Sequence, residues 1–385
     1  MIDRGRAPGR RAAVAAGVAL LLAGGLILLA VPRGAVPPTS AGGAIPPTSA
    51  GGPASSPATA GPWSSQALGA SPSPPPPARD ERAGVAIPGI RLLYADPAPD
   101  LDRVAALGVG WVRFDAAWSE IEIARGAFDW TRLDRGVAAA HDRGLSVLLI
   151  LGTTARWARP PGAEWHHGPA TPEQRAGFAS FASRAATRYR GRVAAWEIWN
   201  EPNLPIAWSP APDPEAYHAL LAEAYPAIHA AAPGAVVLSG GTGGGPTGMA
   251  TLDWYRALYD LGLRGVCDAV AVHPYPDAPD PDSGEMAAAR RVRTLMNERG
   301  DAGKPLWGTE TGAPTGGSPS IDERAQATLL RALYLLWREL PGAGPLLYYT
   351  LRDFGGTDRE AHFGLLRADG VEKLAYDAFR DRSGP

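Results

Sequence analysis

VAAWEIWNEPN, residues 193–203, is a short apolar run that ends in a cluster of polar side chains. Similar runs recur along the chain from residue 85 onward. The candidate strands are Ile90–Tyr94, Trp111–Phe114, Ser146–Leu151, Val193–Trp199, Ala235–Leu238, Ala269–Val272, Pro305–Thr309 and Leu346–Thr350. Continuous apolar runs of this length are typical of strands buried in a parallel sheet.

Helical segments lie between most of these runs. Thr171-Pro-Glu-Gln174 has the pattern of a capping box and precedes a helical apolar period. Asp213-Pro-Glu215 predicts the start of another helix, which should end at Pro233-Gly234. Eight strands alternating with helices, at a mean spacing of about 37 residues, favour a (β/α)8 TIM barrel. An open doubly wound sheet is the alternative, because spacing alone does not show closure.

The N-terminal part of the sequence predicts a membrane-targeting segment followed by a linker. Residues 1–11 carry four arginines and form a cytoplasmic basic segment, and the uncharged apolar residues 12–32 predict a transmembrane anchor or signal segment. We favour the uncleaved anchor, because no small-x-small cleavage site follows the apolar stretch. Residues 33–80 are rich in Pro, Ala, Gly and Ser and predict a disordered linker. Residues 81–385 would then be one catalytic domain outside the cell membrane, or secreted if the segment is cleaved.

Composition excludes several classes of function. The formal net charge is -2 and the basic run lies at the N-terminus, so the remainder is mildly acidic and offers no surface for nucleic acid. Cys267 is the single cysteine, which excludes an intramolecular disulfide and CxxC-type metal sites. The glycine run at residues 240–245 lacks a following GK[ST], and no GxGxxG follows the first candidate strand, so a nucleotide site is not expected.

Two carboxylates end the fourth and seventh candidate strands. Glu201 follows Trp199-Asn200, and Glu310 lies in LWGTETG, residues 306–312. The carboxyl ends of the strands of a barrel meet at one mouth, so we expect the two side chains to face each other. Two facing carboxyl groups are what glycoside hydrolysis requires.

WEIWNEPN together with LWGTETG resembles the clan of retaining glycoside hydrolases that carry catalytic Glu residues on strands 4 and 7, clan A. The resemblance covers about residues 85–380. WVRFDAAWSEIE at 111–122, AVHPY at 271–275 and the closing HFGLLRADGVEKLAYDAFR are similar to family 39 glycosidases and bacterial biofilm-polysaccharide endoglycosidases.

The resemblance implies a role for each matching residue. Glu201 matches the acid/base and Glu310 the nucleophile, while Asn200 matches the residue that binds the sugar 2-hydroxyl. Arg113 and Tyr275 match positions beside the nucleophile, where a cation and a phenol would keep Glu310 ionised. Glu201, which faces that negative charge, is expected to stay protonated. His273 is expected in the site rather than as a metal ligand, and no metal or cofactor is implied.

Aromatic side chains beyond the strand ends are candidate platforms for sugar rings. Trp208 and Trp157 are the favoured candidates, and Tyr349, Trp165 and Phe354 are further ones. Many members of the clan carry a Trp at the end of strand 8, where this chain has Tyr348-Tyr349-Thr350. The predicted function is retaining hydrolysis of O-glycosidic, β-type bonds in an extracellular poly- or oligosaccharide. The alternatives are a non-catalytic carbohydrate-binding barrel and a transglycosylase.

Overall fold

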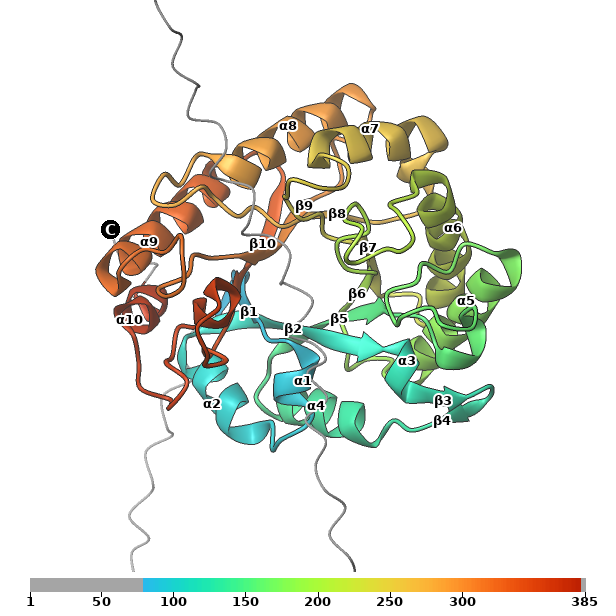
Figure 1. The fold of residues 1–385 in the computed structure, drawn as a ribbon, viewed down its shortest axis with the longest axis horizontal. Coiled ribbons are helices and arrows are strands. Elements are labelled where there is room, and N and C mark those ends of the chain that lie inside the picture. Colours follow the sequence, from blue (N-terminus) through green and yellow to red (C-terminus); the bar gives the residue numbers. More distant parts are fainter. Residues whose placement is uncertain (1–78, 382–385) are drawn as a thin grey trace, which may run out of the picture. The chain divides into compact units, whose positions relative to one another are not determined.

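The computed structural model describes residues 79–381, which form a parallel β-barrel surrounded by helices (Figure 1). The barrel strands are β1 (Asp80–Ala86), β2 (Val109–Ala117), β5 (Ser146–Gly152), β6 (Ala195–Ile198), β7 (Val236–Ser239), β8 (Val270–Val272), β9 (Leu306–Thr311) and β10 (Ala343–Tyr349). Their order in the sheet is β7-β6-β5-β2-β1-β10-β9-β8. A parallel bridge between Leu238 and Ala269 joins β7 to β8. The predicted TIM barrel is therefore confirmed, and the open sheet is excluded by this closing contact.

The first strand was predicted in the wrong place. Residues 90–94 lie largely in a short helix, α1 (Gly89–Leu92), and the first strand is β1 at Asp80–Ala86. Only the last four residues of β1 are buried, and its first three, Asp80-Glu-Arg82, are charged. The apolar signal of this strand is therefore too short to stand out. With the first strand at Asp80–Ala86, α1 lies at the mouth of the barrel, at the ends of β1 and β2.

The remaining helices follow the predicted alternation. They are α2 (Ala98–Ala106), α3 (Trp118–Ile121), α4 (Thr131–Asp142), α5 (Pro172–Arg188), α6 (Pro214–Ala231), α7 (Thr251–Leu261), α8 (Gly284–Glu298), α9 (Glu323–Glu339) and α10 (Leu374–Arg380). The capping box at Thr171 and Gln174 opens α5, and the Asp213 side chain caps α6. A small antiparallel hairpin, β3 (Glu122–Ala124) and β4 (Ala127–Phe128), follows α3.

Alternation along the strands divides the core into two layers. In β5, Val147 and Leu149 pack toward the helices, whereas Leu148 belongs to a smaller cluster that includes Ala195, Leu238 and Leu347 from other strands. The smaller cluster fills the barrel, since successive side chains of a strand point to opposite faces. Only its carboxyl-terminal mouth is therefore available for a site.

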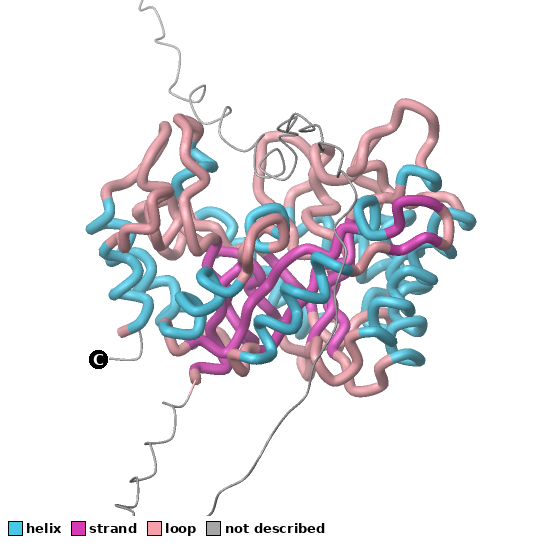
Figure 2. The backbone as a smooth tube through the Cα atoms, turned by 90° about the horizontal axis from the view of Figure 1, so that it is seen from below, coloured by secondary structure: helices cyan, strands magenta, loops and turns pink. Residues whose placement is uncertain are grey.

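The longest loops gather at one end of the barrel, as Figure 2 shows. They follow the carboxyl ends of the strands, which is where TIM barrels carry their sites. The predicted basic segment, anchor and almost all of the linker lie outside the described residues. Within residues 79–381, no helix is long and apolar enough to cross a membrane.

Candidate active site

The two predicted catalytic carboxylates come together at the mouth of the barrel. Glu310 is the fifth residue of β9, and Glu201 follows β6 after a short turn. Nδ1 of His273 lies 3.0 Å from Glu201 Oε1 and 3.7 Å from Glu310 Oε2. Both carboxylates thus flank one imidazole nitrogen, although they are far apart in sequence.

The backbone that presents Glu201 is unusual. Trp199 and Glu201 have positive φ angles of 71° and 47°, and Thr153, just after β5, has a φ of 62°. Such left-handed conformations cost non-glycine residues about 1 to 3 kcal/mol each, and they persist where the surroundings fix them. The Glu201 amide donates to the Gly241 carbonyl at 2.9 Å, and the Trp199 indole donates to the Ala207 carbonyl at 2.9 Å. Packing and hydrogen bonds therefore hold Glu201 in this turn.

The glycine run after β7 lies directly against the site. A Cβ on Gly241 would collide with the His273 ring, and a Cβ on Gly243 would collide with the Glu201 carboxylate. These glycines bring the backbone close to both side chains. Their role is close approach, which differs from the phosphate binding of other glycine-rich loops.

Arg113 is the cation that joins the site. It lies in the middle of β2, which extends to Ala117, and its side chain is 2% exposed. Its Nη1 donates to Glu310 Oε1, and its Nη2 donates to Asn200 Oδ1 at 2.7 Å. This contact occupies the Asn200 side-chain oxygen, so Asn200 can offer a ligand its Nδ2 as a hydrogen-bond donor. The structure thus brings together Arg113, Asn200 and Glu310 as predicted.

Glu197 is a buried carboxylate that sequence reasoning missed. It accepts from Arg113 Nε at 2.6 Å, from the Gly241 amide at 2.8 Å and from Thr309 Oγ1 at 3.1 Å. Removal of one partner from a buried ion pair costs about 3 to 5 kcal/mol. The available signal was a charged residue inside the apolar run of β6. Glu197 orients Arg113 and ties β2, β7 and β9 together.

Glu310 is held in its ionised form. Burial opposes the charge on this carboxyl, but the charges of His273 and Arg113 and hydrogen bonds from Arg113 and Tyr275 outweigh burial and lower the pKa of Glu310. Tyr275 Oη donates to Glu310 Oε2 at 2.9 Å. Burial likewise opposes the charge on His273, yet the nearby Glu310 and Glu201 raise the pKa of the imidazole. An ionised Glu310 is suited to nucleophilic attack.

Replacing Tyr275 with Phe should move the acidic limb of the pH–rate profile upward. A hydrogen bond to a charged group is worth about 1.5 to 3 kcal/mol, and one pKa unit corresponds to about 1.4 kcal/mol, so we expect a shift of about one pH unit. The sign follows from the lowered pKa of Glu310, because loss of a donor to the carboxylate raises that pKa again. The measurement is kcat/KM against pH. Tyr376→Phe is the matched control, because it removes a phenol that donates to the Arg103 carbonyl in the outer layer. Equal acidic limbs in the wild type and both variants would refute the effect of Tyr275 on the pKa of Glu310.

The predicted aromatic platforms are only partly at the site. Tyr349 and Trp165 line the pocket beside Glu310. Trp208 is 1% exposed and packs against Trp199 and Tyr217, so it has no free face for a sugar ring. Trp157 is half-buried, with its edge against Trp118 and the Arg125 guanidinium 4.6 Å from its ring centroid. Phe354 is half-buried under Arg91. Trp208 is thus a packing residue, whereas Trp157 has Arg125 over its ring and does not line the pocket beside Glu310.

Metal-ligating side chains do not form a cluster in this part of the molecule. Among residues 79–381, no group of three or more His, Cys, Asp or Glu side chains has the geometry to hold a metal ion.

The chain matches the cellulase family, glycosyl hydrolase family 5, over residues 85–337. It is similar to the solved structure of a family 39 glycoside hydrolase from Bacteroides cellulosilyticus WH2, with 26% identity and a TM-score of 0.68 over 80% of this chain and 64% of that one. GH5_18 from Streptomyces cattleya, solved in complex with GlcNAc, shares 22% identity and a TM-score of 0.61 over 79% and 80% of the two chains. The exo-β-1,4-mannosidase Op5Man5 from Opitutaceae bacterium strain TAV5 shares 22% identity and a TM-score of 0.58 over 79% and 59%. A search of curated protein sequences finds no match.

These similarities agree with the resemblance to clan A and to family 39 that the sequence motifs indicated. The chain spans 64% of the length of the family 39 enzyme. The match to the family 5 model includes the barrel strands from β2 to β9. The family match covers well over half of the chain. We therefore conclude that this chain belongs to glycosyl hydrolase family 5 and is a clan A glycoside hydrolase.

Proposed function

We propose that this protein hydrolyses β-glycosidic bonds of an extracellular poly- or oligosaccharide with retention of configuration. The observation that supports it is that Glu201 Oε1 and Glu310 Oε2 lie 3.0 and 3.7 Å from the same atom, His273 Nδ1. The distance between Glu201 Oε1 and Glu310 Oε2 cannot exceed the sum of their distances to His273 Nδ1. This limit is compatible with the separation of about 5 to 5.5 Å between the carboxyl groups of retaining enzymes, and it supports retention.

Each step uses a group already in place. Glu310 attacks the anomeric carbon and forms a covalent ester bond, while Glu201 gives its proton to the glycosidic oxygen, which leaves with the bonding electron pair. Water then attacks the anomeric carbon, Glu201 takes a proton from it, and the Glu310–sugar bond breaks. Arg113 and Tyr275 hold the Glu310 carboxylate ready for attack and stabilise it when it leaves.

Configuration of the first product tests this proposal. A panel of plant β-glycans, bacterial exopolysaccharides and aryl β-glycosides is first screened for release of reducing ends. Proton NMR of the best substrate should then show the β-anomer first, before it equilibrates. An α-anomer would indicate inversion, and longer oligosaccharides in place of reducing ends would indicate transglycosylation. Binding without release would support a binding barrel.

We also propose that residues 12–32 anchor the enzyme in the membrane with its barrel outside. This proposal is supported by the arginines before an uncharged stretch of 12–32 and by the Pro-rich residues that follow. Carbonate extraction of membranes from cells that express the full chain should leave it in the pellet. Release of the whole chain into the supernatant would refute the anchor.

A further inference from the structure

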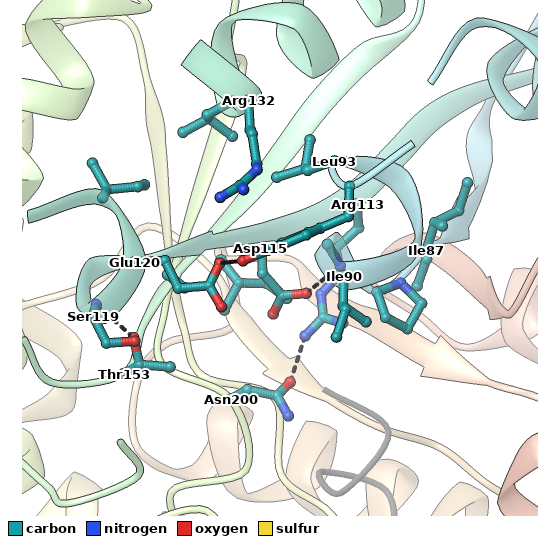
Figure 3. Close-up of a pocket in the computed structure, with 18 of the residues that line it drawn as sticks. Ile87, Ile90, Leu93, Arg113, Asp115, Ser119, Glu120, Arg132, Thr153 and Asn200 are labelled. Atoms are coloured by element: carbon teal, nitrogen blue, oxygen red, sulfur yellow. Dashed lines mark hydrogen bonds between the residues drawn. The ribbon is translucent and has the colours of Figure 1, made fainter. Parts of the chain in front are cut away.

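A pocket opens beside Glu310, at the carboxyl ends of β1 and β2 (Figure 3). Glu310, Asn200 and Tyr349 are among the residues that line it. Its apolar wall comes from the segment before and within α1 and from α4, through Ile87, Pro88, Ile90, Leu93 and Leu133. In the proposed mechanism, Glu310 attacks the anomeric carbon of the glycone, which is the sugar that stays bound in the covalent intermediate. A pocket beside Glu310 is therefore in the correct position to hold the glycone.

Asp115 projects into this pocket between Glu120 and the Arg113 guanidinium (Figure 3). Its Oδ2 accepts a hydrogen bond from the Gly89 amide at 2.7 Å, so α1 fixes the orientation of the carboxylate. Burial raises the pKa of Asp115, against hydrogen bonding by Gly89 and the charge of Arg113. Its Oδ1 is the acceptor that remains for a ligand.

Four carboxylates line the pocket, those of Asp115, Glu120, Asp129 and Glu310, against two cations, Arg113 and Arg132. Within residues 79–381, Asp115 and Glu120 have no Lys, Arg or His nitrogen within 4.0 Å. Of the two arginines that line the pocket, Arg113 is engaged by Glu197 and Glu310, and Arg132 is exposed with its guanidinium 4.1 Å from the Tyr94 ring centroid. Glu120 accepts from the Tyr94 hydroxyl at 2.6 Å. A ligand in this pocket therefore faces carboxylates that accept hydrogen bonds and repel anions.

We propose that this pocket holds a neutral glycone and that Asp115 determines specificity by accepting a hydrogen bond from one of its hydroxyl groups. The inference rests on the proposed function and names the class of sugar: neutral hexoses or pentoses are accepted, and uronates are rejected. A sugar hydroxyl can donate to Asp115 Oδ1 without a change in its charge. A uronate would place another carboxylate among Asp115, Glu120 and Glu310 in a partly desolvated site, where like charges disfavour each other strongly.

The test uses a set of aryl β-glycosides that all carry the same leaving group. The set contains the best neutral glycoside, its analogues that each lack one hydroxyl, and the corresponding uronide. For the wild-type enzyme, we expect loss of one particular hydroxyl to lower kcat/KM about 10- to 100-fold, since an unmet charged acceptor is costly. In Asp115→Ala, that same loss should have little effect, because the partner is absent. The coupling between the two changes measures the contact.

Asp115→Asn gives a second readout. The amide oxygen can still accept from Gly89, and the amide nitrogen then presents a donor to the pocket. We expect this variant to lose activity on the neutral glycoside and to narrow its discrimination against the uronide. Asp102→Asn is the matched control, because Asp102 is an exposed carboxylate of α2 that pairs with Arg143 and does not line the pocket. It should leave both ratios unchanged.

Distinct results overturn the inference and the proposed function. A wild-type enzyme that cleaves the uronide as well as the neutral glycoside would overturn the inference alone. Equal losses on every substrate in Asp115→Ala would assign Asp115 to structure, and thermal unfolding of the variant would show that loss directly. No hydrolysis of any glycoside by wild-type enzyme would overturn both.

Discussion

Glu310→Gln should lower kcat/KM on the order of 10⁴-fold while the protein keeps its fold. Gln has nearly the same shape as Glu and can still accept from Arg113 and contact Tyr275, but it cannot supply the negative oxygen that attacks the anomeric carbon. Losses of this order or larger accompany removal of a covalent nucleophile in other enzymes. Initial rates on aryl β-glycosides and release of reducing ends from the best polysaccharide measure the effect.

The control for this variant is Glu372→Gln, which changes a partly exposed carboxylate that pairs with Arg103 at the surface. It should keep wild-type activity. A Glu310→Gln enzyme that retained a tenth or more of its activity would place the nucleophile elsewhere, with Asp115 and Glu120 as the nearest candidates in the same pocket. Binding of a substrate polysaccharide should survive in Glu310→Gln, which separates loss of chemistry from loss of the site.

Much of the barrel could be predicted because its strands are buried on both faces. Seven of the predicted strands overlap strands of the barrel, since β2 and β5 to β10 carry continuous apolar runs. The position of β1 was not predicted because three of its seven residues are charged, while Ile90–Tyr94 is apolar for a different reason. Residues from that segment line the pocket beside Glu310. Apolar composition reports burial, and it does not distinguish a strand from a pocket wall.

The meeting of Glu201 and Glu310 at the mouth of the barrel could be predicted because each lies at the end of an apolar run, whereas the side chains that support them could not. Glu197 and Asp115 lie within strands, and only the fold shows that both face the mouth of the barrel. Trp208 shows the opposite error. A Trp in a loop after a strand reads as an exposed platform, yet here the loop folds back and the ring packs on Trp199. The direction of a loop side chain depends on contacts that sequence spacing does not encode.

Glu201→Ala should have an effect that depends on the leaving group. Expulsion of a dinitrophenolate needs no proton, so formation of the covalent intermediate should be nearly as fast as in wild type. A sugar leaving group needs the proton from Glu201, and for natural linkages we expect a loss of about 10²- to 10⁴-fold. Breakdown of the intermediate also slows, because water is no longer deprotonated. A burst of dinitrophenolate followed by slow turnover is therefore expected in stopped-flow measurements.

Azide identifies which carboxylate has been removed. This small anion attacks without a base and can enter the space that the Glu201 side chain leaves, so it should restore turnover of Glu201→Ala and give the β-glycosyl azide. In Glu310→Ala, azide would instead occupy the nucleophile's side and give the α-azide, because only one displacement occurs. Glu285→Ala is the matched control, as Glu285 is a half-buried carboxylate of α8 that accepts from Thr251, the first residue of α7. The Glu285→Ala enzyme should show no dependence on leaving group or azide. An α-azide from Glu201→Ala would instead exchange the acid/base and nucleophile roles of Glu201 and Glu310, because the configuration of the product reports which face of the sugar each carboxylate occupies.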